Sequence, residues 1–354
     1  MDEATRARWA ACTDSFLGNG LVRPRDLIAT VDPDAVPDTY GEGGVVAELE
    51  RHVAALLGKP AAVFLPSGTM AQAATLRVHA DARGPRTVVW HPYCHLERHE
   101  GQAHQRLHQL VGRHAGELER PLTLDDVRAV AEPVAALLLE LPQRDLGGRL
   151  PPWDDLVAQT GWARDRGAAV HLDGARLWEA TAGYERSPAE IAALFDTVYV
   201  SFYKGVGALA GCCVAGSGSD VDQVREWRGR LGGTLYGMWP AASSALTLLD
   251  AALDEMPARM RHARAVADAL AGVPEVRVVP DPPQTPMMHL LFATSAEAYR
   301  LNAKRLAEET GLWVWPSAIS TGDPGVVRTE LSVGRATLRH KPAAIAEILA
   351  GLCD

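Results

Sequence analysis

VHLDGARLW, at residues 170–178, places a carboxylate and a guanidinium directly after an apolar run. Ala168, Ala169 and Val170 are typical of a buried strand, and we expect that strand to span 168–172. Buried carboxylates are rare unless a partner compensates their charge. The sequence therefore predicts that Asp173 and Arg176 face a ligand carrying charges of both signs.

Several similar apolar runs surround this stretch and alternate with helical patterns. Strands buried on both faces have this appearance in parallel sheets, so we expect an α/β fold with a mostly parallel sheet. The pattern changes after about residue 240, where a long helix leads into a smaller α+β region with strands expected near 312–315 and 326–333. Trp313 and Trp315 would alternate along the first of these. The expected organisation is an N-terminal segment (1–45), a large ligand-binding domain (46–250) and a small C-terminal domain (251–354).

Composition limits the partners of the chain. It has 354 residues and a formal net charge of −9, so we expect neither nucleic acid nor an anionic membrane as a partner. The N-terminus has no apolar core of a secretory signal, and no stretch is long enough to span a membrane. Five cysteines without framework spacing, two of them adjacent in an apolar run at 212–213, fit a reducing cytoplasm.

A turn of small residues stands between an apolar run and a helical pattern at FLPSGTMAQ (64–72). Ser67, Gly68 and Thr69 would expose backbone N–H groups at a helix start, where the helix dipole favours an anion such as phosphate. The alternative is a simple helix cap made by Ser67 or Thr69. The stretch lacks the patterns that bind nucleoside triphosphates or dinucleotides.

Lys204 follows the apolar run TVYVSF (197–202) and precedes two nearby glycines. Partial desolvation would lower its pKa and make the amine nucleophilic, although a surface lysine in a turn is the simpler alternative. Lys204 and Asp173 together suggest pyridoxal 5′-phosphate (PLP), since this cofactor needs a lysine for its aldehyde, an acid for its ring nitrogen and a helix start for its phosphate.

Five segments, in this order, resemble the β-eliminating lyase/threonine aldolase family of fold-type-I PLP enzymes: YGEGGVVAELE (40–50), FLPSGTMAQ, His95 with Glu100-Gly101, HLDGARLW and YKGVGALAG. The resemblance implies a large domain with a mostly parallel sheet and a small C-terminal domain. It also implies an amino acid substrate, and a homodimer or homotetramer as the assembly.

The resemblance assigns roles to individual residues. Lys204 matches the lysine that holds the cofactor, and Asp173 matches the partner of the ring nitrogen. Gly68 and Thr69, beside Ser67, match the phosphate turn. His95 matches a histidine that stacks on the ring. Arg176 matches an arginine near the cofactor and the substrate carboxylate, and Arg328 falls where the family keeps a second carboxylate-binding arginine.

The chain departs from threonine aldolases where the substrate would lie. ELPQR (140–144) replaces Glu-Asn-Thr-His, so Gln143 or its neighbours stand where a histidine meets the substrate hydroxyl. We therefore expect a PLP-dependent lyase for β-hydroxy or β-substituted L-amino acids, with threonine-like aldol cleavage favoured. His95 is then the candidate base. The alternatives are β-elimination that gives a keto acid and ammonia, and a PLP-fold binding protein without turnover.

The segment 91–108 is rich in histidine and contains Cys94. His91, His95 and His99 are spaced four residues apart, but the spacing of the acidic residues does not match a zinc motif, so we expect no catalytic metal. His171 shares a strand face with Asp173 and is expected to be a hydrogen-bonded core residue.

Overall fold

The computed structural model describes residues 2–354. The chain forms two compact units. The larger unit consists of Pro24–Asp145 and Leu150–Asp254. The smaller contains the residues up to Arg23, the short stretch Leu146–Arg149 and Glu255–Asp354. The division falls inside the long helix α12 (Trp239–Leu270).

The larger unit is built on a seven-stranded sheet in the order β1-β7-β6-β5-β4-β2-β3. Its β7 pairs antiparallel with both of its neighbours, and all the other pairs are parallel. This confirms the expected α/β class and mostly parallel sheet. The strands are β1 (Ala61–Leu65), β2 (Thr87–Trp90), β3 (Val111–His114), β4 (Ala136–Glu140), β5 (Ala169–Gly174), β6 (Thr197–Ser201) and β7 (Cys212–Gly216).

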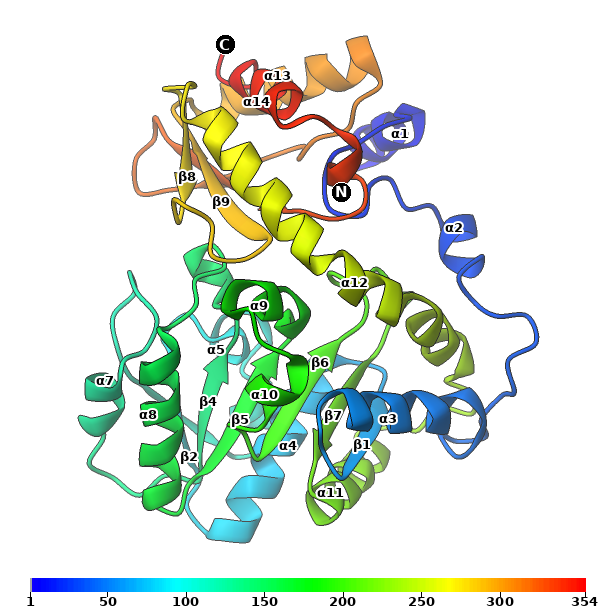
Figure 1. The fold of residues 1–354 in the computed structure, drawn as a ribbon, viewed down its shortest axis with the longest axis vertical. Helices are drawn as coiled ribbons and strands as arrows, with labels where there is room; N and C mark the ends of the chain where they lie inside the picture. Colours follow the sequence, from blue (N-terminus) through cyan, green and yellow to red (C-terminus); the bar gives the residue numbers. More distant parts are fainter. Residues whose placement is uncertain (1) are drawn as a thin grey trace. The chain divides into compact units, whose positions relative to one another are not determined.

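Helices cover both faces of this sheet (Figure 1). On one face, α4 and α11 pack against alternate residues of the central and edge strands, including Val63, Leu65 and Val214. The helices are α2 (Pro24–Ile28), α3 (Gly44–Leu56), α4 (Gly68–Arg83), α5 (His95–His99), α6 (Ala103–Arg106), α7 (Leu124–Arg128), α8 (Trp153–Asp165), α9 (Leu177–Tyr184), α10 (Pro188–Ala192) and α11 (Gly218–Arg230), with the 3₁₀ turn η1 (Arg144–Leu146).

Three neighbouring strands end at the same level of the sheet. Glu140 of β4 is in register with Asp173 of β5, and Asp173 is in register with Tyr199 of β6. Residues in register on adjacent strands project from the same face, so these three polar side chains form a row. In open α/β sheets, ligands bind beyond the carboxyl ends of the strands, which is where this row lies.

The smaller unit has a four-stranded sheet in the order β10-β11-β9-β8, with every pair antiparallel. Its core contains Phe16, Phe292 and Tyr299, all buried. The strands are β8 (Val276–Val279), β9 (Met287–Phe292), β10 (Ile319–Ser320) and β11 (Val327–Ser332). The helices are α1 (Glu3–Ala11), α13 (Ala296–Thr310), α14 (Pro342–Ala350) and the 3₁₀ turn η2 (Thr337–Arg339), together with the C-terminal part of α12.

The expected strand at 312–315 is wrong. The segment forms one isolated bridge, between Leu312 and Asp14, and contains no strand. Side-chain packing replaces strand pairing here: Trp313 packs beside Cys12, and Trp315 makes an edge-to-face contact with Phe16 at 6.0 Å between ring centroids. Alternating tryptophans therefore reflect packing on the N-terminal segment rather than a ladder.

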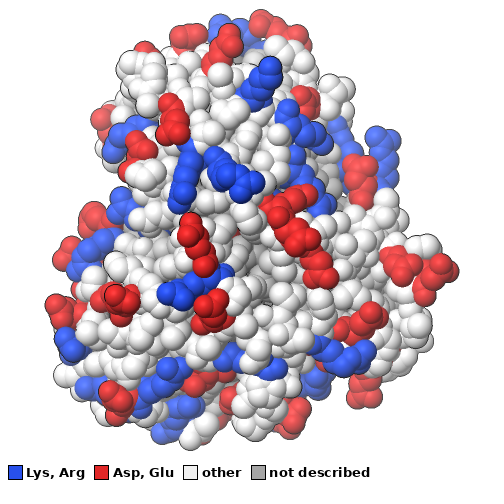
Figure 2. Space-filling model, in the orientation of Figure 1, with Lys and Arg blue, Asp and Glu red and all other residues white. Residues whose placement is uncertain are grey.

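Charged side chains of both signs are interspersed on the face shown in Figure 2. Within residues 2–354, no helix combines the length and the apolar character needed to cross a membrane. The adjacent Cys212 and Cys213 are buried in β7, which confirms that they are small core residues.

Candidate functional site

A polar pocket enclosing about 370 Å³, open solvent included, lies at the carboxyl end of the larger sheet. All its lining residues belong to the larger unit. They come from the start of α4, the α5 segment, and the ends of β4, β5 and β6, and are Gly68, Thr69, Gln72, His95, Glu100, Glu140, Arg144, Asp173, Ala175, Arg176, Tyr199, Tyr203 and Lys204. The structure therefore brings together six of the residues singled out in the sequence: Gly68, Thr69, His95, Asp173, Arg176 and Lys204.

Lys204 stands in the turn that follows β6. Burial, reinforced by the positive charge of Arg176, lowers the pKa of its ammonium group. A larger fraction of the amine is then uncharged and nucleophilic near neutral pH. The turn packs closely on α9, where a Cβ at Gly205 would overlap the carboxylate of Glu179. The surface-lysine alternative does not describe this residue.

Asp173 is 2% exposed at the end of β5. Its Oδ1 accepts a hydrogen bond from the backbone N–H of Ala175 at 3.1 Å, which fixes the carboxylate at the point where the strand turns into α9. Arg176 occupies the residue before the first turn of α9 and lines the same pocket. A carboxylate and a guanidinium thus meet in one cavity, as the opening stretch predicts.

The start of α4 forms a narrow cradle. Gly68 packs so closely on the hydroxyl of Tyr199 that a Cβ at this position would overlap it. Ser67 occupies the cap position but its side chain makes no capping hydrogen bond, so the simple cap is not what this serine provides. Gly68 and Thr69, the first two residues of this 16-residue helix, line the pocket, and the N–H groups at a helix start favour an anion.

A buried hydrogen-bond chain supports the floor of the pocket. His171 Nε2 lies 2.7 Å from Gln72 Oε1, and its Nδ1 lies 2.8 Å from the hydroxyl of Thr197. An amide oxygen only accepts, so Nε2 carries the hydrogen and Nδ1 accepts from Thr197. That hydroxyl in turn accepts from Nε2 of His79 at 2.7 Å. His171 is thus the expected core histidine, and it holds Gln72 in place.

His95 and Glu100 form a pair in the wall of the pocket. His95 Nδ1 lies 3.0 Å from Glu100 Oε1, and the Glu100 side chain is only 2% exposed. Its other oxygen has no hydrogen-bond partner within the described chain. The carboxylate favours a hydrogen on Nδ1, which leaves Nε2 of the imidazole as a proton acceptor.

Glu140, Arg144, Tyr199 and Gln72 line the site but were not predicted from the sequence. Glu140 could have been predicted from the sequence, because it is a carboxylate at the end of an apolar run, as Asp173 is. Arg144, two residues after a proline in an irregular turn, offered no periodic pattern to read.

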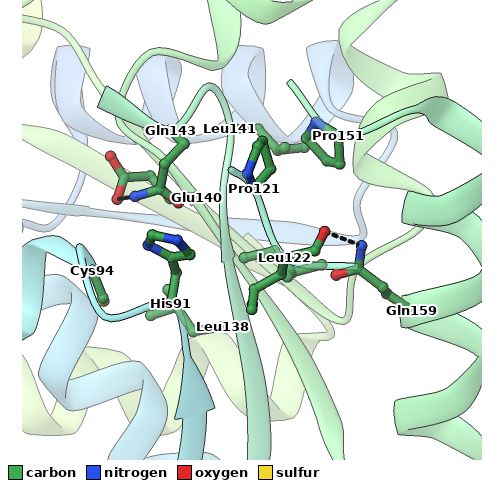
Figure 3. Close-up of a pocket in the computed structure, with 11 residues that line it drawn as sticks. His91, Cys94, Pro121, Leu122, Leu138, Glu140, Leu141, Gln143, Pro151 and Gln159 are labelled. Atoms are coloured by element: carbon green, nitrogen blue, oxygen red, sulfur yellow. Dashed lines mark hydrogen bonds between the residues drawn. The ribbon is translucent and has the colours of Figure 1, made fainter. Parts of the chain in front are cut away.

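Gln143 lies in a neighbouring pocket with His91, Cys94 and Gln159 (Figure 3). Its Nε2 donates hydrogen bonds to Glu140 Oε2 at 2.9 Å and to the backbone oxygen of Tyr93 at 3.3 Å. Gln143 therefore lines the neighbouring pocket rather than the polar pocket, and its hydrogen bond to Glu140 connects it to the latter.

Arg328 lies on β11, in the smaller unit.

The histidines of 91–108 have separate partners: Nε2 of His91 bonds backbone oxygens, whereas His104 lies near Glu97. Within residues 2–354, the structure groups no three histidine, cysteine or acidic side chains in a way that could hold a metal ion.

The model of the Beta-eliminating lyase family matches residues 28–294 of this chain. A solved structure from Exiguobacterium sp. 255-15, provisionally named aromatic amino acid β-eliminating lyase/threonine aldolase, is 36% identical with a TM-score of 0.91, covering 98% of each chain. A provisionally named L-allo-threonine aldolase from Listeria monocytogenes EGD-E is 35% identical with a TM-score of 0.91, covering 98% of this chain and 97% of its own. Low-specificity L-threonine aldolase 1 of Arabidopsis thaliana is 26% identical over 82% of this chain and 85% of its own.

Proposed function

Because this chain belongs to the β-eliminating lyase family, we propose that its polar pocket binds PLP and cleaves β-hydroxy amino acids of the threonine type into glycine and an aldehyde. One observation carries the proposal. Lys204, Asp173 and the start of α4 line one cavity and supply, in that order, an amine, a carboxylate and an anion cradle. Those are the three groups that the cofactor requires.

The residues present fit this cofactor. Gly68 and Thr69 line the pocket at the start of α4, where backbone N–H groups favour an anion such as phosphate. Glu100 keeps an unpartnered oxygen in the wall of the pocket. Lys204 would hold the aldehyde carbon, Asp173 the ring nitrogen, and Gly68 with Thr69 the phosphate. When bound, PLP supplies an electron sink that stabilises negative charge at Cα of the amino acid.

The charged residues of the site then take different tasks. Asp173 keeps a proton on the ring nitrogen by its negative charge, in a position where solvent barely reaches it. Arg176 binds the substrate carboxylate or the cofactor phosphate, with Arg328 as a second candidate for the carboxylate. Lys204, whose pKa is lowered by burial and by Arg176, takes or returns the proton at Cα.

Aldol cleavage requires a base for the β-hydroxyl group. Nε2 of His95 is that base, because Glu100 occupies Nδ1 and so leaves Nε2 free to accept a proton. Gln143 is bonded to Glu140 and Tyr93, and an amide cannot act as a base at neutral pH. It remains a candidate for orienting the hydroxyl.

β-Elimination is the second candidate function, and the position of Gln143 favours it. A site with a glutamine where threonine aldolases carry a histidine has one base fewer for the hydroxyl proton. Lys204 alone suffices to remove the Cα proton, after which the bond between Cβ and its leaving group breaks. Water then hydrolyses the released enamine to a keto acid and ammonia.

A substrate screen on the purified holoprotein separates the two functions. L-Threonine, L-allo-threonine, L-serine and β-chloro-L-alanine are incubated separately, and aldehyde and ammonia are measured in each reaction. Aldehyde with glycine supports aldol cleavage, and ammonia with keto acid supports elimination. Cofactor binding without either product from any substrate would contradict both functions. We further propose a homo-oligomer, dimer or tetramer, located in the cytoplasm.

A further inference from the structure

Glu140 is the one residue shared by two pockets of the larger unit. On one side it lines the polar pocket, together with Asp173, Arg144 and Lys204. On the other it faces the neighbouring pocket, whose wall is mainly leucine and proline (Figure 3). No role follows for this carboxyl from the assignments made above, yet it stands next to the partner of the ring nitrogen.

Both oxygens of Glu140 accept a hydrogen bond from a nitrogen donor. Oε2 accepts from Nε2 of Gln143 at 2.9 Å, and Oε1 accepts from the backbone N–H of Arg144 at 3.0 Å. These two bonds fix the plane of the carboxyl group at the end of β4. Figure 3 shows the Gln143 and Glu140 side chains together at one side of the pocket, with His91 and Cys94 nearby.

The register of the sheet sets Glu140 beside Asp173. The two residues are Cα partners on parallel strands, and adjacent strands lie about 4.8 Å apart. Their side chains project from the same face and line the same pocket. Two carboxylates this close, beside apolar walls, repel each other, and the repulsion is relieved when one of them keeps a proton.

We propose that Glu140 and Asp173 form one acid unit holding a single proton, and that Glu140 is a positioning residue that keeps Asp173 as the single negative charge beside the ring nitrogen. The neutral Glu140 donates its O–H toward Asp173 or toward water, while Gln143 and Arg144 hold its oxygens in place. The role beside the cofactor rests on the proposed function, but the shared proton does not.

The charges around Glu140 agree with this assignment. Loss of hydration, followed by the negative charge of Asp173, raises the pKa of Glu140 to about 8, against the opposing effects of the backbone hydrogen bond from Arg144 and of the charge of Lys204. The ionisable groups nearest to it are Asp173, Arg144, Asp145, Lys204 and Cys94. His95, Glu100, Arg176, Tyr199 and Tyr203 line the same polar pocket, and His91 lines the neighbouring one. Cys94 is neutral, because burial and the nearby carboxylates raise the pKa of its thiol.

The first test uses cofactor-free protein and no substrate. Between pH 4.5, the ordinary pKa of a glutamate, and about 8, folded Glu140 keeps a proton that the unfolded chain releases. The unfolding equilibrium constant of wild type should therefore rise with pH, relative to that of Glu140→Gln, by up to about tenfold per pH unit in this window. The exposed Glu48 on α3 provides the matched control, and Glu48→Gln should show no pH-dependent difference. A wild-type to Glu140→Gln difference that is constant with pH would overturn the proposal.

The second test does not need a variant that folds well. Wild-type protein labelled with ¹³C at glutamate side-chain carboxyls should show one carboxyl resonance that titrates near pH 8, far above the others. Its absence, with all glutamates ionised at pH 6.5, would refute the shared proton.

In the holoprotein, the absorbance of the bound cofactor should change with a midpoint near pH 8 in wild type, and this change should be missing in Glu140→Gln. An identical profile in both proteins would leave Glu140 without influence on the ring and overturn its positioning role. Failure of threonine cleavage would alter none of these results.

Discussion

Nδ1 of His95 lies 3.0 Å from Oε1 of Glu100, and the second oxygen of that carboxylate is buried without a hydrogen-bond partner in the described chain. A carboxylate placed in this way orients the imidazole and favours a hydrogen on Nδ1, which leaves Nε2 as the accepting nitrogen. It is the arrangement of a base held ready for a proton on a bound ligand.

The first prediction concerns this pair. His95→Asn removes the titratable nitrogen and should reduce acetaldehyde release from threonine by about 10²-fold or more. Glu100→Gln retains the imidazole but loses the orienting charge, so acetaldehyde release should fall less in this variant than in His95→Asn. Exchange of the Cα proton of glycine, which needs only Lys204, should stay within a few-fold of wild type in both variants, as followed by NMR in deuterium oxide. Equal loss of exchange and cleavage would instead indicate a general defect in binding.

The second prediction concerns Lys204. Lys204→Ala should abolish borohydride-stable attachment of PLP, measured by the mass of the reduced protein, together with turnover. Lys304→Ala, at an exposed position on α13, is the matched control and should retain both. A reduced adduct of undiminished yield in Lys204→Ala would move the attachment to another lysine.

The third prediction concerns Asp173. Asp173→Asn keeps the shape of the side chain but removes the charge opposite the ring nitrogen. The variant should still bind PLP, whereas kcat should fall by about a hundredfold or more, since such a preorganised charge contributes about 3 kcal/mol to the transition state. An unchanged kcat would show that a different group protonates the ring.

The fourth prediction concerns the cradle at the start of α4. Gly68→Ala brings a methyl group into the Tyr199 hydroxyl, and overpacking of this kind costs about 1–3 kcal/mol. The Kd for PLP should rise by about 10-fold or more. Combining it with Tyr199→Phe removes the overlapping oxygen and should restore part of the affinity. If the double variant binds no better than Gly68→Ala, the overlap is not the cause.

The fifth prediction concerns pH and stability. Burial lowers the pKa of His171 to about 3 and that of His79 to about 4, so both are neutral in the folded protein near pH 6. The unfolded chain binds these protons below an ordinary histidine pKa of 6.5, so the contribution of the two histidines to stability is fully present above pH 6.5 and falls as pH drops toward 4. Urea unfolding at several pH values should show this slope, and His171→Gln should flatten it. An equal slope in both proteins would assign the acid sensitivity to other groups.

Apolar runs and turn residues were enough to predict the sheet, because a strand buried on both faces must be apolar along its length. Asp173 and Lys204 could be predicted as site residues, because a charged side chain at the end of a buried apolar strand needs a partner of opposite charge. Tyr199 was not readable, since a tyrosine inside an apolar run is an ordinary core residue until the fold sets its hydroxyl against Gly68. The prediction of a strand at Trp313 and Trp315 was wrong, because three consecutive residues, Leu312, Trp313 and Val314, are buried by side-chain packing without any pairing of the backbone into a sheet.

The register that joins Glu140, Asp173 and Tyr199 has a consequence for how this chain can change in length. Side chains alternate between the faces of a strand, so inserting or deleting one residue within β5 would turn Asp173 away from the pocket and expose its neighbours to it. A change of two residues would preserve the face but displace the carboxylate by about 6.6 Å along the strand. The loops at the amino ends of the strands lie away from the pocket, so their length does not determine which face Asp173 occupies. Insertions and deletions should therefore be tolerated in those loops and lethal to the site within the strand.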